Sequence, residues 1–266
     1  MNLHDKTILL VGATSGIGRE LVNQLSEKNC RLILFSRRVE KLKDELQHLL
    51  QTHRAILVPG DVRKPADIEN LVGLIKKESL SLDGIIYSAG VSRPDYIDSL
   101  DLIRSLDTYK INFEGALRIF YQFLPDLMEK GGTFLAGFTS MAADRGMPKT
   151  HSYCASKAAL DRLLECLRID LLDRGVQVFT VAPGYVVTPM SSQNEWPMPG
   201  IWPVRFAVAH ILTEIENCNF VIRFPWYHSW LMKLATLIPD QFFWKIMNKK
   251  RDLVKIKPRS DDEFSW

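Results

Sequence analysis

The sequence predicts an α/β fold: a doubly wound parallel sheet of about seven strands, with helices on both faces. Short apolar runs recur along the chain, and they are continuous rather than alternating, which is typical of strands buried on both faces of a parallel sheet. Amphipathic stretches separate these runs, and the repeated strand–helix order favours right-handed crossovers. A length of 266 residues suits one large domain, so we expect a single domain spanning residues 1–266.

Each element follows from its own pattern. The expected strands, in chain order, are Lys6–Val11, Arg31–Ser36, Arg54–Val58, Gly84–Ser88, Gly132–Phe138, Val176–Ala182 and Phe220–Phe224. The expected helices are Gly18–Lys28, Val39–Gln51, Pro65–Glu78, Leu102–Met128 and Ser152–Arg174. The composition changes after about Met190, since all six tryptophans follow it. We interpret residues 190–266 as a divergent substrate lid and C-terminal tail on the same domain.

Composition and charge exclude several classes of protein. Lysine and arginine exceed the acidic residues by 34 − 31 = 3, which is too weak a bias to indicate nucleic acid as a partner. The four cysteines are scattered without metal-ligand spacing, so we expect reduced thiols and no metal site. The start of the chain lacks a signal-peptide pattern, and no apolar run approaches the ~20 residues that cross a bilayer. We expect a cytoplasmic protein, with contact at a membrane surface as an open alternative.

A glycine-rich turn joins the first strand to the first helix. Glycines permit positive φ and close backbone approach, and free N–H groups at a helix start attract a pyrophosphate. The alternative is a plain tight turn without a ligand. The glycine-rich turn follows the first strand of a strand–helix–strand unit, however, and this position favours dinucleotide binding. The expected contacts are Gly12, Thr14, Ser15, Gly16, Ile17 and Gly18.

The end of the second strand indicates which dinucleotide is bound. A carboxylate there would bind the ribose diol and repel a 2′-phosphate. The sequence instead has Ser36-Arg37-Arg38, and no acid precedes Glu40. Two guanidiniums can bind a phosphate bidentately, and cations at a helix N-terminus need an anionic partner, although a solvent-facing basic helix start is the alternative. We therefore expect NADP(H) rather than NAD(H).

Asp61 and Val62 follow the third strand. Asp61 could accept a hydrogen bond from the adenine amino group, with Val62 against the ring. Capping of the helix that begins at Pro65 is an equally good interpretation of Asp61.

A tyrosine and a lysine stand four residues apart in "HSYCASKAAL", at the start of a long helical pattern. Residues i and i+4 share a helix face, so Tyr153 and Lys157 would project together. A phenol with a pKa near 10 transfers protons poorly at neutral pH unless a cation stabilises its phenolate, and Lys157 would supply that cation. A tuned tyrosine can give a proton to a ketone oxygen or take one from an alcohol. His151, two residues before Tyr153, is interpreted as a helix-start residue off that face.

Two further polar residues join this pair. Ser140 follows the fifth strand, at the sheet edge where ligands bind in such folds, and its hydroxyl could hold the substrate oxygen. Asn112 lies within the long fourth helix, where it could bend the helix and anchor a water leading to Lys157, although a local hydrogen-bonding role is the simpler interpretation.

These motifs occur in the order typical of the short-chain dehydrogenase/reductase family, which the chain resembles over residues 5–190. The resemblance implies a Rossmann-type fold and a catalytic tetrad of Asn112, Ser140, Tyr153 and Lys157. It also implies cofactor contacts from the glycine turn, Arg37, Arg38 and Lys157, and from Asp61, Val62, Ser88, Ala89, Gly90, Pro183, Gly184, Val186 and Thr188. Dimers or tetramers are common in the family, so a homo-oligomer is expected.

The chain departs from the family pattern at two places. The usual Asn-Asn-Ala-Gly is Tyr87-Ser88-Ala89-Gly90, so an amide that ties strands and cofactor together has become a hydroxyl. The turn begins Val11-Gly12, where a threonine is common. Both changes concern scaffold and cofactor fit rather than proton transfer.

The region after the Pro183-Gly184 motif resembles nothing specific. Ser191–Val204 is expected to be a mobile lid over an apolar substrate. Trp226–Met232 and Leu234–Met247 are amphipathic and aromatic-rich, and they are followed by Lys249, Lys250, Arg251, Lys255, Lys257 and Arg259. Packing over the substrate pocket or against a second subunit is favoured, with a surface-lying membrane anchor as the alternative. Both interpretations of the tail favour a bulky apolar substrate.

The leading hypothesis is an NADP(H)-dependent oxidoreductase that transfers hydride between the nicotinamide and a small-molecule carbonyl or alcohol. The rival is a catalytically silent nucleotide-binding or membrane-associated scaffold protein on the same fold. All four tetrad positions are filled, which favours the enzyme. The substrate and the direction of the reaction cannot be deduced from the sequence.

Overall fold

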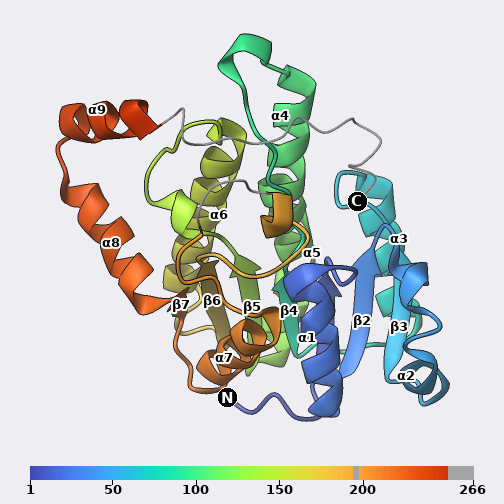
Figure 1. Cartoon of the computed structure of the whole chain (residues 1–266). Coiled ribbons are helices and arrows are strands. Elements are labelled where there is room, and N and C mark those ends of the chain that lie inside the picture. The colour runs from blue at the N-terminus through green and yellow to red at the C-terminus, as the bar shows by residue number, and fades with distance from the viewer. Residues whose placement is uncertain (194–197, 251–266) are drawn as a thin grey trace.

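All seven expected strands are present and form one parallel sheet in the computed structural model, which describes residues 1–193 and 198–250 (Figure 1). The strands are paired in the order β3-β2-β1-β4-β5-β6-β7. Their bounds are β1 Thr7–Val11, β2 Arg31–Ser36, β3 Ala55–Pro59, β4 Gly84–Tyr87, β5 Thr133–Phe138, β6 Val176–Pro183 and β7 Val221–Phe224. The predicted fold class is confirmed.

The apolar runs are continuous because both faces of the sheet are covered. In β1, Ile8 and Leu10 belong to one core cluster, whereas Leu9 and Val11 belong to the other, and all four side chains are fully buried. Successive side chains of a strand point to opposite faces, so a sheet buried on both sides needs apolar residues at every position.

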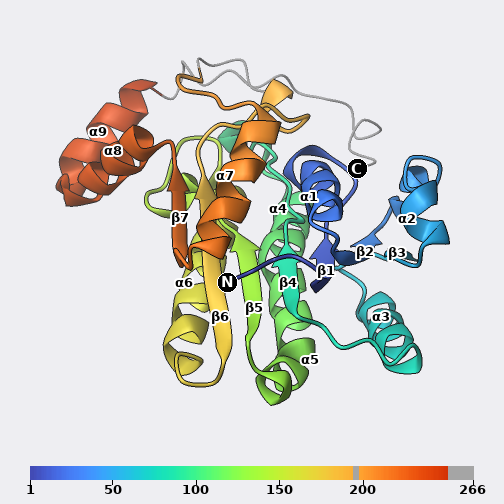
Figure 2. The ribbon, with the colours of Figure 1, turned by 90° about the horizontal axis from the view of Figure 1, so that it is seen from below.

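Helices cover the two faces in separate layers (Figure 2). Apolar side chains of α1 Gly16–Glu27, α2 Gln47–Gln51 and α7 Val204–Glu216 contribute to one core cluster. Those of α3 Pro65–Lys77, α5 Gly115–Lys130 and α6 His151–Asp170 contribute to the other. The chain order reverses between β1 and β4, which places a crevice at the carboxyl ends of these strands.

Two expected helices differ from the prediction. Val39–Gln51 is a 3-10 turn, Val39–Leu42, followed by the short α2. Apolar residues three and four positions apart are compatible with a 3-10 helix and with an α-helix, so their spacing in the sequence could not distinguish the two. Leu102–Met128 is instead α4 Leu102–Tyr109, a π-helical turn Lys110–Glu114 that contains Asn112, and α5.

The last two helices that the structure describes, α8 Trp226–Leu237 and α9 Asp240–Lys250, lie at the β7 edge of the sheet (Figures 1 and 2). Within the part of the chain that the structure describes, no helix combines the length and apolar character that a bilayer span needs. Ser191–Gln193 forms a 3-10 turn at the start of the expected lid, and Trp202 pairs with Val186 near its end. The rest of the lid prediction, at 194–197, and the basic residues beyond 250 lie outside the described residues.

Candidate active site

The glycine turn after β1 has the geometry of a phosphate-binding loop. Gly12 has a φ of +92°, and a Cβ there would lie 2.5 Å from the backbone nitrogen of Ala89. A Cβ on Gly18 would lie 2.0 Å from the Gly12 oxygen. Helix α1 starts at Gly16, and Ser15 makes no side-chain capping hydrogen bond to its first turn. The backbone N–H groups of that turn are therefore suited to an anionic ligand, and the loop fits a dinucleotide pyrophosphate.

Most of the expected cofactor residues line one crevice around this turn. They are Gly12, Thr14, Ser15, Gly16, Ile17, Gly18, Arg37, Arg38, Asp61, Val62, Ser88, Ala89, Gly90, Tyr153, Lys157, Pro183 and Thr188. Sequence analysis missed further lining residues, among them Gly60, Val91, Thr139 and Met190. Each lies within two residues of a predicted position or at the end of an expected strand, which was the available signal.

Two expected residues lie outside this lining. The backbone N–H of Gly184 donates to the Phe224 carbonyl over 2.7 Å, and a Cβ on Gly184 would meet Pro225 at 3.1 Å. Val186 is buried beside Trp202. Gly184 thus connects β6 to the tail, and Val186 helps to anchor the following loop.

Asp61 is engaged by a neighbour that sequence analysis missed. Arg63 donates to both carboxylate oxygens of Asp61 at 2.6–3.0 Å, and its other branch donates to Asp107 over 2.6 Å. Burial alone would raise the pKa of Asp61, but the hydrogen bonds from Arg63 hold it below its ordinary value. The capping interpretation of Asp61 is wrong, because α3 has Lys64 at its N-cap and no side-chain cap.

Tyr153 and Lys157 face the same crevice from α6, as their spacing predicts. The Nζ of Lys157 lies 5.9 Å from the centroid of the Tyr153 ring. It donates a hydrogen bond to the Phe138 carbonyl over 2.7 Å, and burial lowers the pKa of its ammonium to about 8. Gly90 leaves room beside it, because a Cβ there would make a tight contact of 3.2 Å with Nζ.

The electrostatics of Tyr153 differ from the sequence-based expectation. Burial raises the pKa of its phenol, and a hydrogen bond with the Ser140 side chain acts in the opposite direction. The Lys157 ammonium donates to the Phe138 carbonyl rather than to the phenol. The phenol is therefore kept in its protonated form at neutral pH.

Ser140 stands at the end of β5, where its hydroxyl accepts a hydrogen bond from the Ala142 N–H over 3.1 Å. This contact begins a 3-10 turn, Met141–Ala143, which fixes the serine beside the tyrosine. The structure thus brings Ser140 to Tyr153, and Tyr153 and Lys157 line the crevice, whereas Ser140 lies outside its lining. His151 is the exposed first residue of α6, as predicted.

Asn112 lies behind the crevice rather than in its lining. It is fully buried in the π-helical turn. Its side chain accepts from the Val91 N–H at 2.8 Å and donates to the Val91 carbonyl at 2.9 Å and to Ser156 Oγ at 3.0 Å. Asn112 therefore ties the helix to α6 and to the loop after β4.

Tyr87 and Ser88, which stand where the family pattern has Asn-Asn, both make hydrogen bonds to the backbone. Ser88 Oγ donates to the Val11 carbonyl over 2.9 Å, so a hydroxyl links β4 to β1. The buried Tyr87 donates to the Ile111 carbonyl in the π-helical turn over 2.5 Å. Gly115 leaves room for this phenol, because a Cβ there would lie 2.5 Å from its oxygen.

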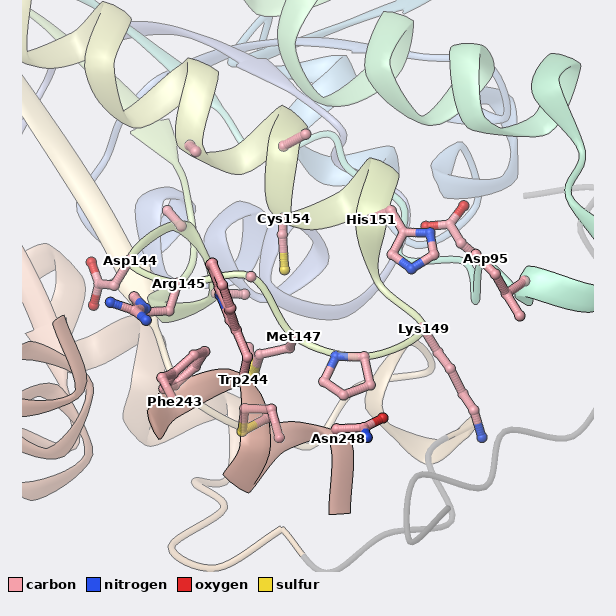
Figure 3. A pocket seen from close by; sticks show the side chains of 18 of the residues that line it. Asp95, Asp144, Arg145, Met147, Lys149, His151, Cys154, Phe243, Trp244 and Asn248 are labelled. Carbon is pink, nitrogen blue, oxygen red and sulfur yellow. The ribbon is translucent and has the colours of Figure 1, made fainter. Parts of the chain in front are cut away.

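A cavity of about 1200 Å³, separate from the glycine-lined crevice, lies beside the loop that follows Ser140 (Figure 3). Its walls come from the loop after Ser140, the first turns of α6 and the inner face of α9. Figure 3 shows Met147, Cys154, Phe243 and Trp244 around it. His151 and Cys154 of its wall flank Tyr153 in the chain, so the cavity adjoins the part of α6 that carries Tyr153.

Comparison with known proteins agrees with this geometry. The family model described as short chain dehydrogenase matches residues 6–197. An uncharacterized oxidoreductase of Myxococcus xanthus is 30% identical over 241 residues, which cover 90% of this chain and 94% of that protein. The 11-beta-hydroxysteroid dehydrogenase-like 3 of Arabidopsis thaliana is 32% identical over 196 residues, covering 73% of this chain and 63% of that protein.

A solved structure shares the fold. It is that of a short chain dehydrogenase from Burkholderia cenocepacia in complex with NADP, with a TM-score of 0.79, 24% identity and coverage of 93% of this chain and 99% of that one. Because the family model matches most of the sheet and the segments that carry Ser140 and Tyr153, the chain belongs to the short-chain dehydrogenase family and is an oxidoreductase of that type.

Proposed function

We propose that the protein transfers hydride between NADP(H) and a carbonyl or alcohol substrate, with Tyr153 as the general acid and base. The observation that carries this proposal is the hydrogen-bonded Ser140–Tyr153 pair beside Lys157 in the glycine-lined crevice. A nucleotide-sensing or scaffold protein would have no need of this arrangement.

The chain's own groups can perform the proton transfer. When bound, the dinucleotide supplies or accepts the hydride. Tyr153 donates its proton to the substrate oxygen in reduction, and Ser140 holds that oxygen beside the phenol. The phenolate that forms lies one helical turn from the Lys157 ammonium, which stabilises it as the charge develops.

The raised pKa of Tyr153 favours the reducing direction at neutral pH. A phenol above its ordinary pKa is a ready proton donor, whereas the reverse reaction needs a phenolate. The rate of carbonyl reduction is therefore expected to be highest at neutral pH and the rate of alcohol oxidation at alkaline pH.

The preference for NADP(H) rests on charge at the end of β2. Arg37 and Arg38 line the crevice there, and Ser36 occupies the position of a ribose-binding carboxylate. The Burkholderia relative is likewise described in complex with NADP. Arg37→Ala is expected to raise the Kd for NADPH about tenfold or more, because a charge-assisted bond to phosphate is lost, while the Kd for NADH barely changes.

Isothermal titration with both cofactors measures this difference. Arg162→Ala is the matched control, since Arg162 is an exposed arginine of α6 outside the crevice. Equal losses of affinity for NADPH and NADH in the Arg37 variant would remove the phosphate-binding argument.

The substrate is proposed to be bulky and largely apolar. The large cavity beside the loop after Ser140 has an apolar part formed by Ala142, Met147, Cys154 and Phe243, and its rim also carries charged side chains such as Asp95 and Lys149. Its volume of about 1200 Å³ is somewhat above the roughly 300–1,000 Å³ of ordinary ligand sites, which leaves room for a large substrate.

Measuring NADPH absorbance with a panel of aliphatic, aromatic and polycyclic carbonyls tests the proposal. We expect turnover with NADPH that exceeds turnover with NADH and that is best for large apolar ketones or aldehydes. Tight NADPH binding without turnover of any carbonyl or any corresponding alcohol would favour the catalytically silent alternative.

We also propose a cytoplasmic homo-oligomer. Leu102 and Ile103 of α4 and Ile169 and Leu172 near the end of α6 are largely exposed apolar side chains, and such surfaces support association between subunits. Light scattering coupled to gel filtration would give a mass of at least twice 30.5 kDa, and a monomer at micromolar concentration would contradict the oligomer.

A further inference from the structure

Helix α8 exposes an apolar stripe along its whole length. Trp226, Trp230, Leu234 and Leu237 follow one another at helical spacing and are between 53% and 78% exposed. Residues at this spacing lie on one face of a helix. Such a face is ordinarily buried, so this one is built to meet something outside the chain.

Helix α9 continues the apolar surface while its other face anchors it to the domain. Phe243 is buried beneath the Arg145 guanidinium, which lies 4.0 Å from the ring centroid. Phe242 and Ile246 remain 64% and 45% exposed outside the lining of the large cavity. The two helices thus form one projecting unit at the β7 edge (Figures 1 and 2).

The charge of this unit identifies the kind of partner. The segment Trp226–Lys249 has a single acidic residue, Asp240, which is paired with Arg145 at 3.1 Å. Its three lysines, Lys233, Lys245 and Lys249, are exposed. The unit therefore presents apolar side chains together with positive charge.

A second copy of the chain fits this surface poorly. In a two-fold symmetric contact the same patch meets itself, which would bring three lysines of each copy together without exposed acids in the segment to offset them. Tryptophan, in contrast, prefers the boundary between lipid headgroups and acyl chains, and lysines are attracted to anionic lipid.

We propose that α8 and α9 dock on the surface of an anionic lipid bilayer, with Trp226, Trp230, Leu234 and Leu237 inserted at the headgroup level. The contact is peripheral. The lysines strengthen it by electrostatic attraction, which salt weakens because the charges lie near water.

Sedimentation of the full-length protein with vesicles tests this proposal. Vesicles of phosphatidylcholine alone are compared with vesicles of phosphatidylcholine and phosphatidylglycerol. Each lysine near an anionic surface contributes about fivefold in affinity, so binding to the mixed vesicles is expected to be about 100-fold tighter and to weaken in high salt. Trp226→Gln/Trp230→Gln is expected to lose binding to both.

Tyr121→Gln/Phe206→Gln, on α5 and α7, is the matched control, because it removes two similarly exposed aromatic side chains elsewhere and should leave vesicle binding intact. Lys233→Glu/Lys245→Glu provides a second variant that should reduce binding to the anionic vesicles alone. Failure of the wild-type protein to sediment with anionic vesicles would overturn the proposal. So would a tryptophan variant that binds normally, or one whose main effect is to convert an oligomer into a monomer.

Discussion

At the scale of single residues, the site combines groups whose protonation is controlled by burial. Lys157 was placed by its spacing from Tyr153, and the structure confirms that both face one crevice. The sequence could not give the direction of the Tyr153 pKa, because burial and the bond to Ser140 depend on residues distant in the chain. Arg63 was likewise missed, since a contact with Asp107 cannot be inferred from local spacing.

Burial of Lys157 predicts a measurable pH dependence of folding. The pKa of this lysine falls from 10.5 to about 8 in the folded chain, so between these values the unfolded chain binds more protons. The free energy of unfolding of the cofactor-free protein should therefore rise with pH over that range, by about 3 kcal/mol relative to Lys157→Met.

Urea unfolding at a series of pH values measures this difference. Lys245→Met, at an exposed lysine of α9, is the control and should follow the wild-type pH curve. A constant difference between wild type and Lys157→Met from pH 7 to about 10.5 would show that the buried ammonium is not destabilised.

At the scale of elements, strands were predicted better than helices. Every expected strand is present to within two residues at each end, because two-sided burial produces an unmistakable apolar run. The π-helical turn at Lys110–Glu114 was not foreseen. Tyr87 of β4 donates its hydroxyl to the Ile111 carbonyl in this turn, and helical periodicity does not record a contact from another element.

Tyr87→Phe tests the role of that contact. Loss of the hydroxyl leaves the buried Ile111 carbonyl without this donor, so the free energy of unfolding should fall by about 1–3 kcal/mol. The value of kcat should fall as well, because Asn112 lies in the same turn, whereas Kd for the dinucleotide should change little. Tyr121→Phe on the exposed face of α5 is the control. Unchanged stability and kcat would mean that the turn forms without Tyr87.

At the scale of the whole molecule, ion pairs connect the tail to the loop that follows Ser140. Asp144 and Arg145, which follow Ser140 closely, pair with Arg223 of β7 and Asp240 of α9. The sequence favoured packing of the tail over the substrate pocket, and the inner face of α9 does line the large cavity. It could not show that most of the tail's tryptophan surface faces outward, since amphipathic spacing does not identify the partner of a helix face.

Arg145→Ala is expected to loosen α9, because it removes both the pair with Asp240 and the cation above the Phe243 ring. The KM for bulky apolar carbonyls should rise severalfold, while the KM for small carbonyls stays unchanged. Hydrogen exchange should accelerate in α9 alone. Arg223→Lys, which retains a cation near Asp144, serves as a milder comparison. Equal changes in KM for large and small substrates would contradict the proposal that the large cavity binds the bulky part of the substrate.

The most direct test of the account is a single-turnover measurement on Tyr153→Phe with NADPH already bound. Rapid mixing with a carbonyl that the wild-type protein reduces gives the rate of NADPH oxidation, and titration gives the cofactor Kd. The account predicts a rate lowered about 10²–10⁴-fold, the size of a general-acid contribution, with Kd almost unchanged. A variant that oxidises NADPH at nearly the wild-type rate would contradict the assignment of Tyr153 as the proton donor.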